Sequence, residues 1–100
     1  MTTIYYTPPS DAIFEEVKQK AIEIWSEYAN EFGYDEFGYV DSKIERIKDM
    51  KNIQDNVMYI VAMFDMNNQI KMAEKLSEEA RKALRERMID GGNSEYTIPF

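Results

Sequence analysis

The chain has 100 residues, 31% of them charged, and a formal net charge of -7. It contains no cysteine, which excludes disulfides, thiolate metal sites and a cysteine nucleophile, and no histidine, the commonest general base and transition-metal ligand. We therefore expect a single domain over residues 1–100 that is not an enzyme and holds no cofactor. The first residues lack a basic region followed by an apolar stretch, so we also expect no signal peptide and a cytoplasmic location.

The charge is unevenly distributed along the chain. Residues 1–40 contain eight acids and only two lysines, whereas residues 68–90 contain six bases and five acids. An acidic block repels a nucleic-acid backbone and attracts a basic protein surface. The sequence thus predicts a protein partner with a basic surface rather than a nucleic acid.

Apolar residues at spacings of three and four predict an amphipathic helix over residues 11–32. Pro8 and Pro9 suit a helix start, and Ser10 or Asp11 can cap it, so residues 1–9 are expected to be extended. Glu23, Glu27 and Glu31 share one face of this helix at i, i+4 spacing. A solvated face explains such a row more simply than a catalytic pair, which needs a pocket that separates two pKa values.

The segment that follows, residues 33–39, has glycines near both ends and three aromatic residues between or beside them. These rings either fold back over the end of the bundle or form an aromatic and acidic contact patch, because tyrosine is enriched at binding surfaces. Together with the acids of the first helix they form a candidate protein-binding surface: Glu16, Glu23, Glu27, Glu31, Tyr34, Asp35, Glu36, Phe37 and Tyr39.

A second helix is predicted over residues 42–65, where Ser42 and Glu45 match a capping box. Its second half is a run of eight apolar residues, 57–64, with no polar side. The run is too short to cross a membrane, which takes about 20 apolar residues. Val57, Ile60 and Phe64 continue the stripe that faces the core. The other five residues of the run are too apolar for a solvated face. We expect them to form a helix or oligomer interface that is covered by the last helices and the tail or by another subunit: Met58, Tyr59, Val61, Ala62 and Met63.

The last third predicts a turn at residues 66–68 and then helices over 68–75 and 78–89, or one helix with a kink, with Ser77 as a fresh cap. Residues 93–100 alternate apolar and polar residues up to Pro99 and should be extended. They either pair with residues 4–6 as two short strands or lie over the bundle. The fold class is therefore all-α, a small bundle of three to four helices with extended terminal segments.

The basic residues of the last helix alternate with acids, so i, i+4 ion pairs account for them. Arginine also binds phosphate in a bidentate way, which leaves a small phosphate ligand as an alternative.

The residues 44–49, 55–65 and 68–69 resemble small accessory proteins of tailed bacteriophages, with a similarity that spans roughly residues 13–90. This resemblance implies a viral, non-structural helical protein, a class that often disables host enzymes or defence systems. The first hypothesis is thus a non-enzymatic inhibitor in the host cytoplasm that docks through its acidic surface on a host or defence protein, for example a CRISPR effector.

Val57, Met58, Tyr59 and Val61 also resemble the Val-Met-aromatic-x-Val segment of phage sponges against cyclic-nucleotide signalling, the anti-CBASS and Thoeris anti-defence hairpins. Those sponges are homo-oligomers that bind the messenger between subunits. This second hypothesis predicts a homo-oligomer with phosphate contacts from Lys71, Lys75, Arg81 or Arg85. A helical protein of the virion is a third hypothesis.

Overall fold

The computed structural model describes residues 8–32, 38–90 and 99–100. Within these ranges it contains five α-helices and no strand, which confirms the predicted all-α class. The helices are α1 (Asp11–Phe32), α2 (Tyr39–Asp49), α3 (Asn56–Ala62), α4 (Met66–Lys75) and α5 (Glu78–Asp90). The predicted pairing of residues 4–6 with the tail, and most of the extended ends at 1–9 and 93–100, lie outside the described residues.

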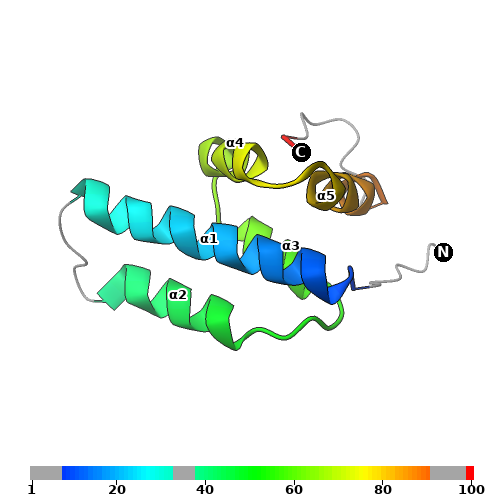
Figure 1. The fold of residues 1–100 in the computed structure, drawn as a ribbon. Coiled ribbons are helices and arrows are strands. Elements are labelled where there is room, and N and C mark those ends of the chain that lie inside the picture. Colours follow the sequence, from blue (N-terminus) through cyan, green and yellow to red (C-terminus); the bar gives the residue numbers. More distant parts are fainter. Residues whose placement is uncertain (1–7, 33–37, 91–98) are drawn as a thin grey trace.

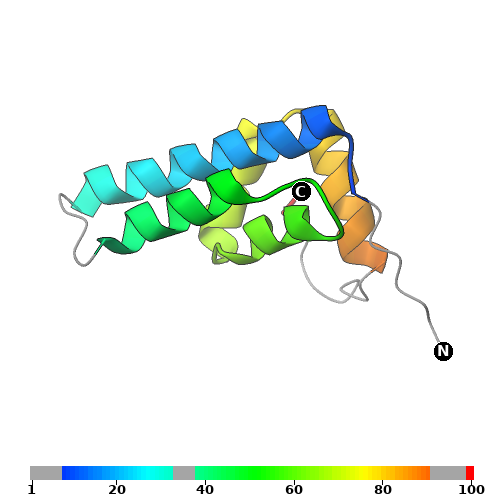
Figure 2. The same ribbon diagram turned by 90° about the horizontal axis from the view of Figure 1, so that it is seen from below.

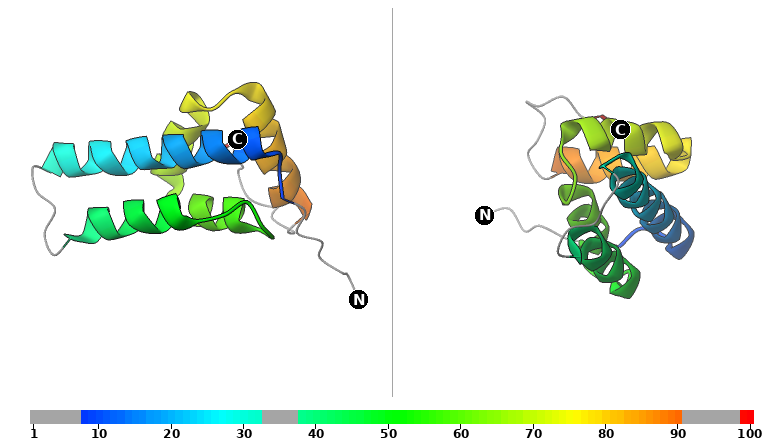
Figure 3. Two further views of the ribbon diagram at one scale, coloured as in Figure 1. Left: turned by 60° about the horizontal axis from the view of Figure 1, so that its bottom comes forward. Right: turned by 90° about the vertical axis from the view of Figure 1, so that its left-hand side faces the viewer.

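Helix α1 is the central element of the bundle. It contacts each of the other four helices, and in Figure 1 α2 lies below it, α4 and α5 lie above it, and α3 lies behind it. Figure 2 shows α2 running alongside α1, whereas α5 crosses α1 near its N-terminal end. The end-on view in Figure 3 shows α4 and α5 together as a layer across α1. The buried side chains of all five helices form one cluster, to which the C-terminal Phe100 also belongs, 5% exposed.

The first helix forms as its sequence predicts. It spans Asp11–Phe32, and the Ser10 hydroxyl accepts the backbone N–H of Ile13 at 3.3 Å, so Ser10 is the cap. The stripe at spacings of three and four is buried, with Val17 and Ala21 completely inaccessible. A local pattern suffices here because both the cap and the stripe are properties of neighbouring residues.

The prediction of one helix over residues 42–65 is wrong. The chain forms α2, an extended connection and α3 instead, and α2 begins at Tyr39, so the predicted capping box at Ser42 does not start it. Gly38 takes a left-handed backbone conformation with φ of 67°, which costs glycine little and starts the helix three residues earlier. Met50 then leaves the helix with extended dihedral angles, although no proline or glycine lies between 50 and 55.

Contacts with the start of α1 hold this break in place. The Lys18 ammonium donates to the carbonyl oxygens of Lys48 at 3.0 Å and Met50 at 3.1 Å, groups that the end of α2 leaves without intrahelical partners. The Asn52 side chain donates to the Pro9 carbonyl at 2.7 Å and to the Asp11 carboxylate at 2.9 Å. Because these partners lie 30 to 43 residues away, the helix periodicity of the sequence contains no sign of them.

The expected turn at residues 66–68 is also wrong, because these residues form the first turn of α4. Asp65 caps this helix, and its carboxylate accepts the N–H of Asn68 at 2.9 Å. The last two helices are separate, which confirms the predicted alternative of two helices rather than one helix with a kink. Ser77 caps α5 as predicted, with its hydroxyl accepting the N–H of Ala80 at 3.2 Å.

Candidate functional site

Glu16, the first acid of the predicted binding surface, holds α5 against α1. One of its carboxylate oxygens accepts the Ser77 N–H at 2.6 Å, and the other accepts the Ser77 hydroxyl at 2.9 Å. These bonds supply an acceptor for an N–H at the start of α5. Both oxygens of Glu16 are therefore engaged inside the molecule.

Two further acids of the row connect α1 to α4. The Lys75 ammonium lies 3.1 Å from the Glu27 carboxylate and 3.9 Å from that of Glu23, and Glu23 also pairs with Lys20 at 3.1 Å. The hydrogen bond to Glu27, with the charges of neighbouring acids, raises the pKa of Lys75 above its ordinary value. The face that the sequence suggested for docking is thus partly neutralised by the protein's own lysines.

Glu31 and Tyr39 are the members of the predicted surface that stay accessible in the described part of the chain. Glu31 is exposed and forms no ion pair with a described residue, and Tyr39 is 55% exposed. The remaining four, Tyr34, Asp35, Glu36 and Phe37, lie outside the described residues.

Most of the cations suggested for phosphate binding are paired with acids. Glu78 forms ion pairs with Arg81 at 2.6 Å and with Arg85 at 2.9 Å. The two guanidiniums, Arg85 by its hydrogen bond above all, lower the pKa of the Glu78 carboxyl group. Arg85 also donates to the main-chain oxygen of Phe100. With Lys75 occupied by Glu27, only Lys71 of the four forms no ion pair with a described residue.

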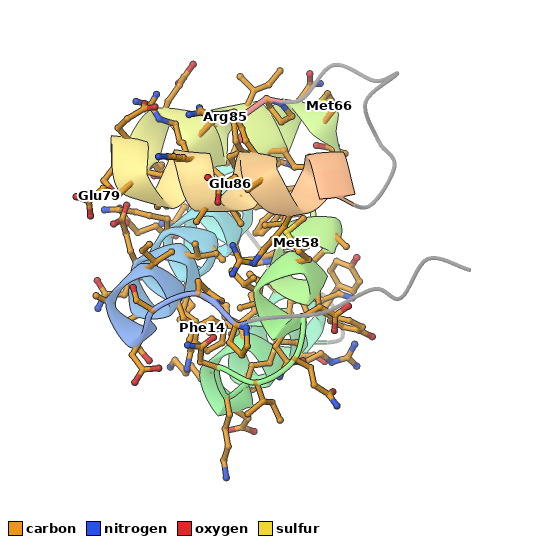
Figure 4. All side chains as sticks on the ribbon, turned by 90° about the vertical axis from the view of Figure 1, so that its right-hand side faces the viewer. Phe14, Met58, Met66, Glu79, Arg85 and Glu86 are labelled. Carbon is orange, nitrogen blue, oxygen red and sulfur yellow. The ribbon has the colours of Figure 1, made fainter. Side chains whose placement is uncertain are left out.

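The apolar run 57–64 divides between the core and the surface. Val57, Ile60, Val61 and Phe64 are buried inside the chain. Val61, which the sequence left open between a helix interface and a subunit interface, thus packs within the molecule. Met58 and Met63 are half-buried against the core, and Figure 4 shows Met58 on the flank of α3 beside α5. Tyr59, 55% exposed, and Ala62 remain open to solvent.

A cleft of about 230 Å³ lies between the C-terminal half of α1, the start of α2 and the turn that joins α3 to α4. Its described lining residues are Ile24, Trp25, Tyr28, Tyr39, Met63, Phe64, Asp65 and Asn68. They come from α1, α2, α4 and the turn between α3 and α4, and they include one carboxylate and no cation. The volume is below the 300 to 1,000 Å³ usual for drug-sized ligands, which suits a single side chain.

Aromatic rings dominate this cleft. The Trp25 ring meets Tyr28 and Tyr39 edge to face, with ring centroids 5.9 and 6.0 Å apart, and it lies 5.3 Å from the ring of Phe64. Trp25 itself is only 7% exposed, whereas Tyr28 is 40% exposed, so the two tyrosines present the accessible aromatic surface. Lys43 already places its ammonium 5.4 Å from the centre of the Tyr39 ring.

The cleft also contains polar groups. The buried indole N–H of Trp25 has no hydrogen-bond acceptor among the described residues, an arrangement that costs about 1–3 kcal/mol. The Asn68 side-chain amide forms no hydrogen bond with a described residue, and Asp65 uses one carboxylate oxygen as the α4 cap. A cleft with aromatic walls and a few polar groups is the usual form of a recognition site.

Sequence reasoning missed most of this cleft. It did not single out Trp25 as a site residue, and it placed Asp65 at the end of a long helix rather than at the start of α4. The spacing of Trp25 and Tyr28 put both on one side of α1, but no local pattern places Tyr39 and Asp65 beside them. The available signal was Asp65 as a cap residue three positions before Asn68.

The part of the chain that the structure describes meets neither the requirements of a metal site nor those of a membrane-spanning helix. No group of three or more acids there could hold a metal ion. None of its helices has both the length and the apolar character needed to cross a bilayer.

No family of known proteins, no curated protein and no solved structure matches this chain. Its function must therefore be inferred from its own geometry.

Proposed function

We propose that this chain is a non-enzymatic inhibitor that binds a protein of the host or of a defence system through the surface around the cleft. The observation that carries the proposal is the exposure of large apolar side chains there. Tyr28 and Tyr39 border the cleft and are 40% and 55% exposed. Contiguous exposed apolar side chains mark interaction sites, and tyrosine is enriched among residues that dominate binding energy.

The internal pairing of α1 acids moves the proposed docking surface toward one end of the bundle. Glu16 is committed to α5, and Glu23 and Glu27 are committed to Lys75. Glu31 and Tyr39 remain available and belong to the end of α1 and the start of α2, which also border the cleft. The net charge of -7 favours a partner with a basic surface, such as the nucleic-acid site of a CRISPR effector in the host cytoplasm.

The sponge hypothesis receives less support. Three of its four suggested cations would have to exchange a carboxylate for a phosphate, and the ion pairs Arg81–Glu78 and Arg85–Glu78 are 2.6 and 2.9 Å long. A cleft of about 230 Å³ within one chain is also small for a cyclic dinucleotide or larger messenger.

Affinity capture from infected bacterial cells, followed by calorimetry with the purified partner, tests the docking surface. We expect Tyr39→Ala to weaken binding at least about tenfold, because truncating an aromatic residue that dominates an interface costs about 2 kcal/mol or more. Ile53→Ala is the matched control, since Ile53 is 54% exposed and does not line the cleft. Equal affinities of wild type and Tyr39→Ala, with both proteins folded by circular dichroism, would show that the surface is wrong.

Charge reversal at Glu31 tests the contribution of the remaining acid. Glu31→Lys should weaken partner binding about threefold to fivefold and reduce its salt dependence, because an exposed charge pair contributes up to about 1 kcal/mol. Glu86 is an exposed residue of α5 (Figure 4), so Glu86→Lys makes the same charge change away from the cleft and should leave binding unchanged. Equal losses in both variants would attribute the effect to net charge rather than to this surface.

A further inference from the structure

The cleft has the composition of a site for a positively charged group. Its accessible walls are the rings of Tyr28 and Tyr39, packed against Trp25, and aromatic faces attract cations by about 0.5–2 kcal/mol. The protein already uses this chemistry at the rim, where Lys43 lies over Tyr39, and elsewhere, where Lys18 lies 5.6 Å from the Phe14 ring.

Charge complementarity points to the same class of ligand. Among the described lining residues of the cleft, Asp65 is the single charged group. Asp65 is exposed and forms no ion pair with a described residue. The opposite situation holds for Glu23, Glu27 and Glu78, each of which faces a cation of its own chain.

The hydrogen bonds of Asp65 favour an ammonium over a guanidinium. Oδ1 accepts the Asn68 N–H at 2.9 Å, which leaves Oδ2 as the unoccupied oxygen. Arginine is bound best by two free oxygens in a bidentate pair, whereas an ammonium is a point charge that needs only one. The Asn68 side-chain oxygen, which has no hydrogen-bond partner among the described residues, can accept a second ammonium hydrogen.

From these observations we infer that the cleft receives one lysine side chain of the partner protein. Its ammonium lies at Asp65 and Asn68, and its methylene stem lies along Tyr28, Tyr39 and Met63. A stem on apolar surface with a charged tip at a polar group is the usual way lysine packs. The inference rests on the proposed function, because the lysine belongs to the docked protein.

The test uses the full chain and a short peptide as a probe. An acetylated and amidated Gly-Lys-Gly peptide is titrated into the ¹⁵N-labelled protein, and the indole N–H of Trp25, the single tryptophan, reports binding. We expect a saturable shift with the lysine peptide and none with a norleucine peptide of the same length. Binding of the norleucine peptide, or no saturable shift with lysine, would overturn the inference. An arginine peptide that binds as tightly as the lysine peptide would overturn the choice of an ammonium.

Asp65→Asn is the decisive variant, because asparagine caps a helix as well as aspartate and the fold is thus preserved. It should weaken binding of the lysine peptide about threefold to fivefold. Asp49→Asn removes the same charge at the other end of α2 and should have no effect. If both variants bind the peptide like the wild type, Asp65 is not the ammonium site.

The two proposals fail in different ways. A partner that loses affinity for Tyr39→Ala but not for Asp65→Asn, with no peptide binding, would overturn the lysine inference and leave the docking surface in place. A partner that binds Tyr39→Ala like the wild type would overturn the docking surface itself.

Discussion

The N-terminal part of α1 and the wall that α1 contributes to the cleft use their polar groups in opposite ways. In the N-terminal part, Glu16 bonds to Ser77 and Lys18 bonds to two carbonyls at the end of α2. At the cleft, the Trp25 N–H has no acceptor among the described residues, and Tyr28 is 40% exposed. One helix thus fixes the bundle along part of its length and leaves a buried N–H and an exposed ring at the cleft. A charged side chain that looks available in the sequence can be fully occupied by the fold.

The largest expected effect concerns two neighbours on α3 that repeat this contrast. Ile60→Ala should lower the free energy of unfolding by about 2–5 kcal/mol, because Ile60 is completely buried and its removal leaves a cavity. Tyr59→Ala should change it by less than about 0.5 kcal/mol, since Tyr59 is 55% exposed. Urea denaturation measures both. A comparable loss in Tyr59→Ala would mean that this ring is covered, most simply by a second copy.

Glu16→Ala tests the contacts by which the N-terminal part of α1 holds α5. It should destabilise the protein by about 1–2 kcal/mol, because it removes two charge-assisted hydrogen bonds to Ser77. Glu15→Ala is the matched control, since Glu15 is exposed and its only ion pair to a described residue is 4.0 Å long. Thermal unfolding of both variants measures the difference. Equal stabilities would show that Ser77 holds α5 without help from Glu16.

Trp25→Phe tests the effect of the buried Trp25 N–H at the cleft on stability. The change removes a buried N–H that has no acceptor and keeps an aromatic ring, so the free energy of unfolding should fall by no more than about 1 kcal/mol. Chemical denaturation followed by circular dichroism is suitable, because the variant has no indole fluorescence. A loss well above 2 kcal/mol would mean that the N–H has a partner or that phenylalanine fills the site poorly.

The smallest effect is the pH dependence from Glu78. Its folded pKa lies below that of the unfolded chain, so its stabilising contribution is complete above about pH 4.3, the ordinary glutamate value, and is lost as pH falls through the lower folded pKa. Wild type should therefore exceed Glu78→Gln slightly in melting temperature at pH 6, and the two should converge in acid. A difference that persists at the lowest pH would attribute the effect to packing rather than to charge.

Local patterns in the sequence were sufficient for α1 and for the start of α5. The periodicity of residues 14–28 and the hydroxyls of Ser10 and Ser77 act over three or four residues, so their consequences can be derived without the fold. The candidate site was predicted less well. Of the described residues in the predicted binding surface, Glu31 and Tyr39 remain exposed, whereas Glu16, Glu23 and Glu27 form hydrogen bonds or ion pairs with residues outside α1.

What the sequence determined by itself is the all-α class, the amphipathic first helix and the acidic charge. The tertiary structure decided where the second helix breaks, which acids are consumed by lysines and serines, and which rings meet around Asp65. The physical reason is the range of the interactions. Helix periodicity and caps are set by near neighbours, whereas Lys18 meets Met50 across 32 positions and Glu16 meets Ser77 across 61.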